Sequence, residues 1–96
     1  MIRHVVMFKL SPDADPVEVE AWLGRLRELP SKIDFVRAFS VGRDELHLPR
    51  SYDVALVADM DSLDDVRRYG PHPAHAPVAE MSAKLCQHIC SVDFEV

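Results

Sequence analysis

The chain lacks a long apolar run, an excess of basic residues and more than two cysteines. No apolar stretch approaches the ~18 residues that a membrane-spanning helix requires, so no membrane partner is expected. Lysine and arginine number 11 against 16 aspartates and glutamates, which gives a net charge of −5. Nucleic acids and anionic membranes are bound through basic patches, and the basic residues here are scattered along the chain. The composition therefore argues against binding to either.

The two cysteines, Cys86 and Cys90, are four positions apart. On one strand their Cα atoms would lie ~13 Å apart, too far for a disulfide, and on a helix ~6 Å apart along the axis, within reach only by distortion. We expect reduced thiols, which suits a reducing compartment. The apolar start is interrupted by Lys9 and has no small-residue cleavage site, so no signal peptide is expected and a cytoplasmic location is the default.

Ninety-six residues predict one domain spanning 1–96. Hydrophobic residues make up 48% of the chain and charged residues 28%, which is typical of a globular protein. A domain this short buries only a little over ~60% of the surface of its unfolded chain. A partner subunit would therefore add stability.

Residues 2–10 predict a strand with apolar groups on both sides. One side carries Ile2, His4, Val6, Phe8 and Leu10. Asp15 followed by Pro16 has the form of a helix N-cap with proline at the first helical position, and Pro30 predicts the end of that helix after Leu29. Five apolar residues at helical spacing form its buried stripe: Val19, Trp22, Leu23, Leu26 and Leu29.

The rest of the chain continues this pattern of strands and helices. Further strands are predicted over 34–41, 52–60 and 87–96. A helix over 63–69 is N-capped by Ser62 and stopped by Gly70-Pro71, and another runs from Pro73 or Ala74 to Leu85. The order strand, helix, strand, strand, helix in two pieces, strand predicts an α+β, ferredoxin-like βαββαβ subunit with an antiparallel sheet.

The predicted strands are apolar on both sides, whereas helices in this topology cover only one face of the sheet. The other face would leave a large apolar patch exposed in a monomer. We therefore expect a homodimer that forms through the sheet face. If the two sheets curl around each other, they enclose a barrel-like interior, and a small apolar or carbonyl ligand could bind there.

The segment from Tyr69 to His75 concentrates side chains that can transfer protons or form hydrogen bonds. It holds Tyr69, His72 and His75, and two prolines stiffen the backbone between them. Histidine is the side chain whose ordinary pKa lies nearest physiological pH, and tyrosine can donate or accept a hydrogen bond. The run is suited to proton transfer, although the same stiffness would equally serve a structural turn.

These features resemble the stress-responsive A/B barrel, or Dabb, family over nearly the whole chain, roughly from Ile2 to Phe94. The resemblance rests on His4 in the opening strand, the apolar strand with acidic punctuation from Asp53 to Asp59, and Tyr69 ahead of His72-Pro73-Ala74-His75. Membership implies a dimeric α+β barrel of ferredoxin-like subunits.

One member of the family is a plant polyketide cyclase that folds a linear polyketide by aldol condensation without a cofactor. Its catalytic tyrosine and histidine match Tyr69 and His75, and a cavity histidine matches His4. A further histidine, on its third strand, is replaced here by Val54. Related barrels include monooxygenases and haem-degrading enzymes.

Each candidate residue also has a structural interpretation. His75 is either a general acid/base or a histidine that bonds the backbone at a helix start, and Tyr69 either binds a carbonyl oxygen or packs in the core. His4 is either a ligand contact or a hydrogen-bonded core group. The other histidines are read as structural or solvated: His72 in the turn, His47 in a polar loop and His88 on the last strand.

A metal site built on His72 and His75 lacks an obvious third ligand, and the acidic run Asp61, Asp64 and Asp65 is read as a negatively charged helix start. Neither a metal nor an organic cofactor is expected.

Three functions remain open from the sequence. The first is a cofactor-free enzyme acting on a carbonyl compound, which the pair Tyr69 and His75 motivates. The second is a non-catalytic dimeric ligand-binding or stress-response protein, which Val54 and the plain composition motivate. The third is a barrel oxygenase, for which the chain has no haem- or flavin-binding signature.

Overall fold

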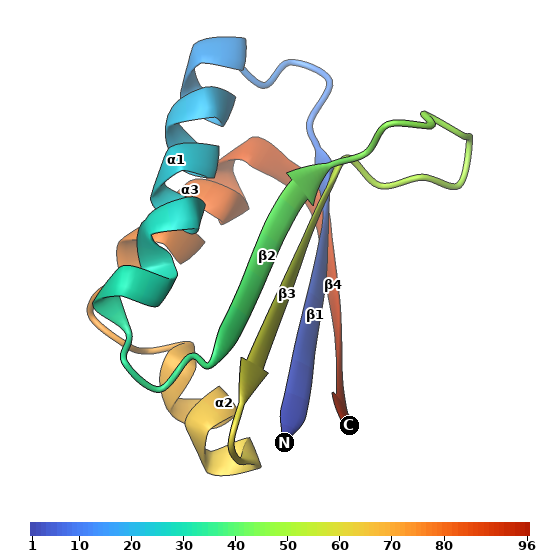
Figure 1. Ribbon diagram of the computed structural model, residues 1–96. Helices are drawn as coiled ribbons and strands as arrows, with labels where there is room; N and C mark the ends of the chain where they lie inside the picture. The colour runs from blue at the N-terminus through green and yellow to red at the C-terminus, as the bar shows by residue number, and fades with distance from the viewer.

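The computed structural model describes residues 1–96 and contains one antiparallel sheet covered on one side by helices (Figure 1). The strands lie in the order β2-β3-β1-β4, so β1 and β3 are central and β2 and β4 are the edges. The predicted ferredoxin-like α+β fold is confirmed. The elements in chain order are β1 (Ile2–Leu10), α1 (Pro16–Lys32), β2 (Ala38–Arg43), β3 (Val54–Met60), α2 (Leu63–Tyr69), α3 (Ala76–Leu85) and β4 (Cys86–Glu95).

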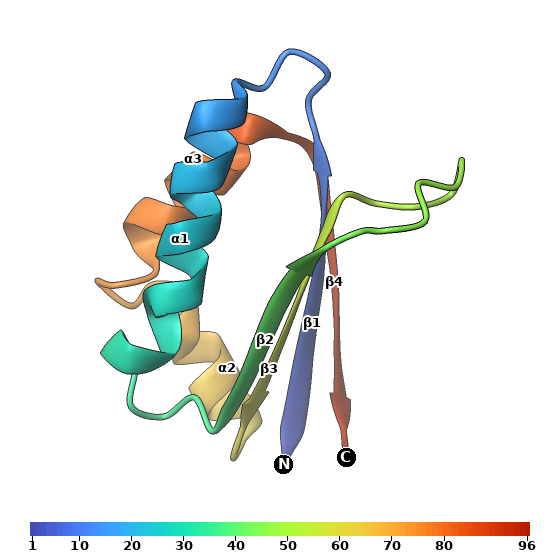
Figure 2. The same ribbon diagram turned by 45° about the horizontal axis from the view of Figure 1, so that its top comes forward.

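The two faces of the sheet differ in what covers them. We call the helix-covered side the inner face; on β1 it carries His4, Val6 and Phe8. The opposite side is the outer face, and nothing in the chain covers it (Figure 2). Because side chains alternate along a strand, the β1 residues between these three, Val5 and Met7, point to the outer face.

The core fills the space between the inner face and the helices. Trp22 and Leu23 on α1 are fully buried, and the Phe8 ring meets the Trp22 ring edge-on at 5.0 Å between centroids. The Trp22 indole N–H donates to Ser82 Oγ on α3 at 2.8 Å, so the one polar atom of this ring is satisfied. These contacts hold α1 and α3 against β1.

The predicted starts of the first two helices are confirmed. The Asp15 carboxylate accepts from the backbone N–H of Val17 at 2.9 Å, and Pro16 occupies the first helical turn. Ser62 Oγ accepts from the backbone N–H of Asp65 at 3.2 Å at the start of α2. Both caps satisfy donors that have no partner within their own helix.

The prediction that Pro30 ends the first helix is wrong, because α1 continues to Lys32 with Pro30 inside it. Proline has no N–H to donate to the Leu26 carbonyl and its ring crowds that carbonyl, so the last turn needs stabilisation from outside the helix. Leu29 and Ile33 on either side of it are both buried, and the Ile33 N–H donates to the Leu29 carbonyl. Burial of these two side chains holds the last turn in place.

The second strand also begins later than predicted. β2 spans Ala38–Arg43 rather than 34–41, because the neighbours Phe35 and Val36 are both buried before the strand starts. Two consecutive residues cannot both point to the same face of a regular strand. Smaller corrections apply elsewhere: β3 begins at Val54, α3 at Ala76 and β4 at Cys86.

Cys86 and Cys90 both lie on β4 and are unpaired, as expected. Burial raises the pKa of Cys86 to about 11, which leaves its thiol protonated and unreactive at neutral pH. None of the helices has the length and apolar character needed to span a membrane.

Candidate functional site

A cavity of about 210 Å³ lies between the inner face and the helices. Its lining is mostly apolar and comes from β1, β3, β4 and all three helices. Three of the lining side chains are the predicted site residues His4, Tyr69 and His75. The structure therefore brings together, in one cavity, residues that are 71 positions apart at the extremes. The other liners are Val6, Phe8, Leu26, Leu56, Ala79, Ser82, Ile89 and Ser91.

The cavity opens toward the edge strand β4. Ile89 on this strand is 43% exposed although its side chain lines the cavity, and Ser91 beside it is also exposed. The other side of the cavity is closed by the buried residues Phe8, Leu26 and Leu56. The cavity wall is thus exposed at β4 and buried and apolar elsewhere.

Tyr69 is the last residue of α2 and is 3% exposed. Its hydroxyl is buried and has no hydrogen-bond partner. Such a group costs about 1–3 kcal/mol when it is left unsatisfied, so most buried hydroxyls in native proteins are bonded. Burial raises the pKa of Tyr69 to about 12, so the phenol keeps its proton at neutral pH and can donate it in a hydrogen bond.

His75 precedes α3, and its ring packs on the Tyr69 ring at 4.4 Å between centroids. His75 Nδ1 lies 2.8 Å from the Gly70 carbonyl oxygen, which directly follows α2. A carbonyl can only accept, so Nδ1 carries the hydrogen and Nε2 is left as the free nitrogen. The stiff turn thus fixes the tautomer of this ring.

The surroundings of His75 keep the ring neutral. Burial lowers the pKa of His75 more than any other contribution, and the nearby His4 and His72 lower it further, whereas the bond to the Gly70 carbonyl raises it. A neutral ring with a bare Nε2 is the form that accepts a proton.

His4 faces Tyr69 from the sheet, with ring centroids 5.7 Å apart in an edge-on arrangement. Its Nδ1 lies 2.5 Å from an Asp93 carboxylate oxygen on β4, directly across the strand pair. The ionised carboxylate can only accept, so Nδ1–H donates to it and Nε2 is the ring nitrogen without a protein partner. Asp93 orients His4 as a carboxylate orients a catalytic histidine in other enzymes.

Asp93 is the site residue that sequence reasoning missed, because a partner 89 positions away can be found only from the strand register. One signal was present: on β4 the polar residues Ser91 and Asp93 share the inner face, while Val92 and Phe94 point outward. This arrangement reverses the usual amphipathic pattern and marks a polar site beneath the strand.

The remaining histidines lie outside the cavity. His72 Nδ1 accepts from the backbone N–H of Ala74 at 3.0 Å, which confirms its role in fixing the turn. His47 is exposed in the loop between β2 and β3, and His88 lies on β4 with its Nδ1 2.6 Å from the Tyr52 hydroxyl. Val54 is buried in the core and does not line the cavity.

No group of three or more His, Cys, Asp or Glu side chains could hold a metal ion. His72 and His75 thus lack the third ligand that a site at this spacing would need.

The candidate site residues do not face the space between two packed sheets, where the sequence led us to expect a ligand. His4 and Asp93 point to the inner face, so their cavity lies between sheet and helices within one subunit. The alternation of side chains along β1 and β4 excludes them from the outer face.

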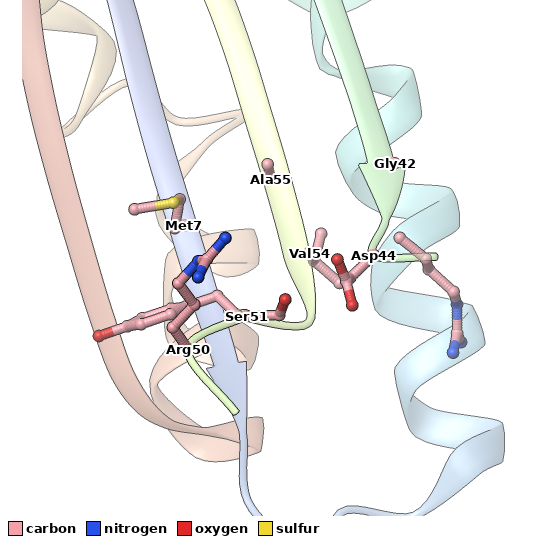
Figure 3. Close-up of a pocket in the computed structure, with 9 residues that line it drawn as sticks. Met7, Gly42, Asp44, Arg50, Ser51, Val54 and Ala55 are labelled. Atoms are coloured by element: carbon pink, nitrogen blue, oxygen red, sulfur yellow. The ribbon is translucent and has the colours of Figure 1, made fainter. Parts of the chain in front are cut away.

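The outer face has a hollow of its own, of about 340 Å³, where the loop between β2 and β3 meets the sheet (Figure 3). Met7 and Ala55 form its apolar floor and Arg50 lies over it, with no ion-pair partner. Its titratable lining residues include Arg43 and Arg50, which stay protonated, and none of its polar side chains is buried without a partner as the Tyr69 hydroxyl is. The inner cavity is therefore the better candidate for chemistry.

Comparison with known proteins supports this fold and assigns the family. Residues 2–96 match the Stress responsive A/B Barrel Domain, or Dabb, family. The chain is 35% identical over 77 residues to an uncharacterized protein of Streptomyces coelicolor, a match that covers 78% of this chain and 79% of that one.

Two solved structures are similar over 99% of this chain. One is a dimeric ferredoxin-like protein of unknown function from Thermobifida fusca, with 30% identity, a TM-score of 0.88 and 90% of that chain covered. The other is a hydroxynitrile lyase from Passiflora edulis, with 15% identity, a TM-score of 0.85 and 92% of that chain covered, a likeness that concerns the fold alone. The chain belongs to the stress-responsive A/B barrel (Dabb) family.

Proposed function

We propose that this protein is a cofactor-free enzyme that transfers protons on a small carbonyl compound bound in the inner cavity. The observation that carries the proposal is the Tyr69 hydroxyl, which is buried, unpartnered and flanked by two histidines. A ligand oxygen that accepts from this hydroxyl would recover the hydrogen bond that the empty cavity leaves unmade.

The chemistry follows from which atoms are free. His75 Nε2 is the general base and removes a proton from the carbon next to the ligand's carbonyl group. The electron pair left behind moves onto the carbonyl oxygen, and the Tyr69 hydroxyl stabilises this developing charge by donating to it. His75 and Tyr69 stack at 4.4 Å, so both can reach one small molecule at once.

The size and lining of the cavity limit the ligand. Its volume of about 210 Å³ is below the ~300 Å³ at the lower end of typical ligand pockets. The rest of the lining is mainly apolar and includes Phe8, Leu26 and Leu56. The preferred compound therefore has one carbonyl group on a short apolar body.

Hydrogen exchange in D2O tests this proposal even while the product of the reaction is unidentified. A panel of small ketones and aldehydes is incubated with the protein, and loss of the α-proton signals is followed by NMR. We expect at least one compound to exchange faster than in buffer, with the acceleration lost in His75→Gln and reduced roughly 100-fold or more in Tyr69→Phe.

The matched control is His88→Gln, which removes a sheet histidine outside the cavity and should leave exchange unchanged. If compounds bind, as seen by ligand-observed NMR, but none exchanges faster than in buffer, the protein is a dimeric ligand-binding protein rather than an enzyme. Full exchange activity in His75→Gln would assign the reaction to another residue.

We also propose that two copies pack through their outer faces. Met7, Val92 and Phe94 on this face are each more than 40% exposed, an apolar surface that a monomer would leave in water. The loop between β2 and β3 extends past the same face, away from the helices (Figures 1 and 2). The similar Thermobifida protein is described as dimeric, which supports this assembly.

A further inference from the structure

Two histidines in one small cavity share a single carboxylate. His4 and His75 both line the cavity and pack against the same Tyr69 ring. None of the lining residues is acidic, and the only carboxylate bonded to either ring is Asp93, which bonds His4. Two positive charges in this space would repel each other with one counter-charge between them, so one proton is favoured over two.

The partners of the two rings differ in a way that decides where this proton resides. A proton on His4 Nε2 leaves a charged ring directly against the Asp93 carboxylate, 2.5 Å away. His75 instead bonds the neutral Gly70 carbonyl and sits at the N-terminal end of α3, where the helix dipole opposes a positive charge.

Other charged groups near the pair do not change this balance. Tyr69 is neutral, with a pKa raised to about 12 by burial, and His72 contributes only repulsion to His75. The lining residues from α1 and α3, Leu26, Ala79 and Ser82, are uncharged. Asp93 on β4 is thus the only negative group that acts on the pair through a direct contact.

We propose that His4 and His75 share one proton, and that Asp93 is the positioning residue that keeps this proton on His4 in the resting site. The inference rests on the proposed function and assigns its second proton-transfer group. His75 Nε2 takes a proton from one atom of the ligand, whose electron pair stays on the ligand. His4 Nε2 gives its proton to a second atom of the ligand.

This exchange conserves protons and charge. After it His75 is the charged ring and His4 the neutral one, and return of the proton from His75 to His4 through solvent restores the resting site. The class of reaction that fits removes a proton at one atom and delivers one at another, as in an isomerisation or in the reversible cleavage of a bond next to a carbonyl group.

An NMR titration of the histidine rings tests the shared proton without any ligand. The protein is labelled with ¹⁵N- and ¹³C-histidine, and the His75 midpoint is measured in the wild type, His4→Gln, Asp93→Asn and His88→Gln. We expect the His75 midpoint to rise by about half a pH unit or more in His4→Gln, because a repelling charge is removed. Asp93→Asn should raise it in the same direction, because the amide no longer balances a charge on His4.

His88→Gln is the matched control and should leave the His75 midpoint unchanged. The ¹⁵N shifts should also show neutral His4 with its hydrogen on Nδ1 in the wild type and a mixture of tautomers in Asp93→Ala, a signature that loss of packing alone would not give. A His75 midpoint that is equal in the wild type and His4→Gln would overturn the shared proton. Absence of catalysed exchange in D2O would instead count against the proposed function and leave this titration intact.

Discussion

The inner and outer faces of the sheet differ in which kind of interaction they leave unsatisfied. The inner face leaves a hydrogen bond unmade, because the Tyr69 hydroxyl has no partner. The outer face leaves apolar surface uncovered at Met7, Val92 and Phe94. None of its polar side chains is buried without a partner, and Tyr52, for example, bonds His88. A buried hydroxyl without a partner is suited to a small ligand that accepts a hydrogen bond. An exposed apolar surface is suited to contact with another protein surface.

The same strands build both faces, so the difference arises from alternation alone. On β4 Asp93 turns inward to His4, and Val92 turns outward. A change on one face should therefore leave the other face intact, even between neighbouring residues. The following variants test that separation.

The largest effect is expected from a charge placed on the outer face. Val92→Asp would bury an unpaired carboxylate between two subunits, which costs about 3 kcal/mol or more and weakens the dimer about 100-fold or more. Size-exclusion chromatography with light scattering measures the change, and the histidine NMR signals should stay as in the wild type. Val17→Asp, at an exposed position on α1, is the control. A wild-type monomer at micromolar concentration would refute the dimer itself.

The next effect compares two leucines on α1. Leu23 is fully buried, and Leu23→Ala should lower the free energy of unfolding by about 3 kcal/mol. Leu26 lines the cavity, so it has fewer packing partners to lose, and Leu26→Ala should cost about 1 kcal/mol less. Urea unfolding measures both. Equal losses would mean that the cavity is filled by side-chain movement in solution.

Removal of the hydroxyl should change the free energy of unfolding in opposite directions at Tyr69 and Tyr52. Tyr69→Phe removes an unsatisfied buried group and should raise the free energy of unfolding by about 1 kcal/mol, although it weakens ligand binding. Tyr52→Phe breaks the bond to His88 and should lower that free energy. Destabilisation by Tyr69→Phe would show that its hydroxyl finds a partner in solution.

The smallest effect concerns pH. The pKa of His75 is lowered in the folded protein, so below its ordinary value of about 6.5 the unfolded chain binds this proton more readily than the folded chain does. Wild-type stability should therefore fall relative to His75→Gln as the pH drops from 7.5 to 5.5. Urea unfolding at the two pH values checks this, with His47→Gln as the control because His47 is exposed. A difference that does not vary with pH would contradict the burial of His75.

The elements of the fold could be predicted because their signals are local. Asp15 and Ser62 cap helices from two or three residues away, and the stripe around Trp22 lies within one helix. The end of α1 could not be placed, because burial of Ile33 by the rest of the fold outweighs the local signal of Pro30. Where tertiary burial competes with a local breaker, the sequence alone does not decide.

For the site, the motif predicted His75 and Tyr69, but it did not predict the hydrogen-bond partners of the site residues. The unpartnered hydroxyl of Tyr69 and the contact between His4 and Asp93 depend on strand register and on what fails to fill the cavity. Neither property is encoded within a short window of residues.

Trp22 makes the intrinsic fluorescence of this protein a reporter of the cavity. It is the single tryptophan of the chain, and its indole touches the cavity wall twice, through the Phe8 ring and through the hydrogen bond to Ser82. A molecule that binds in the cavity would disturb both contacts and change the intensity or the emission maximum of the tryptophan fluorescence. Binding could then be followed by fluorescence on the unlabelled protein, one compound at a time, before any reaction is known.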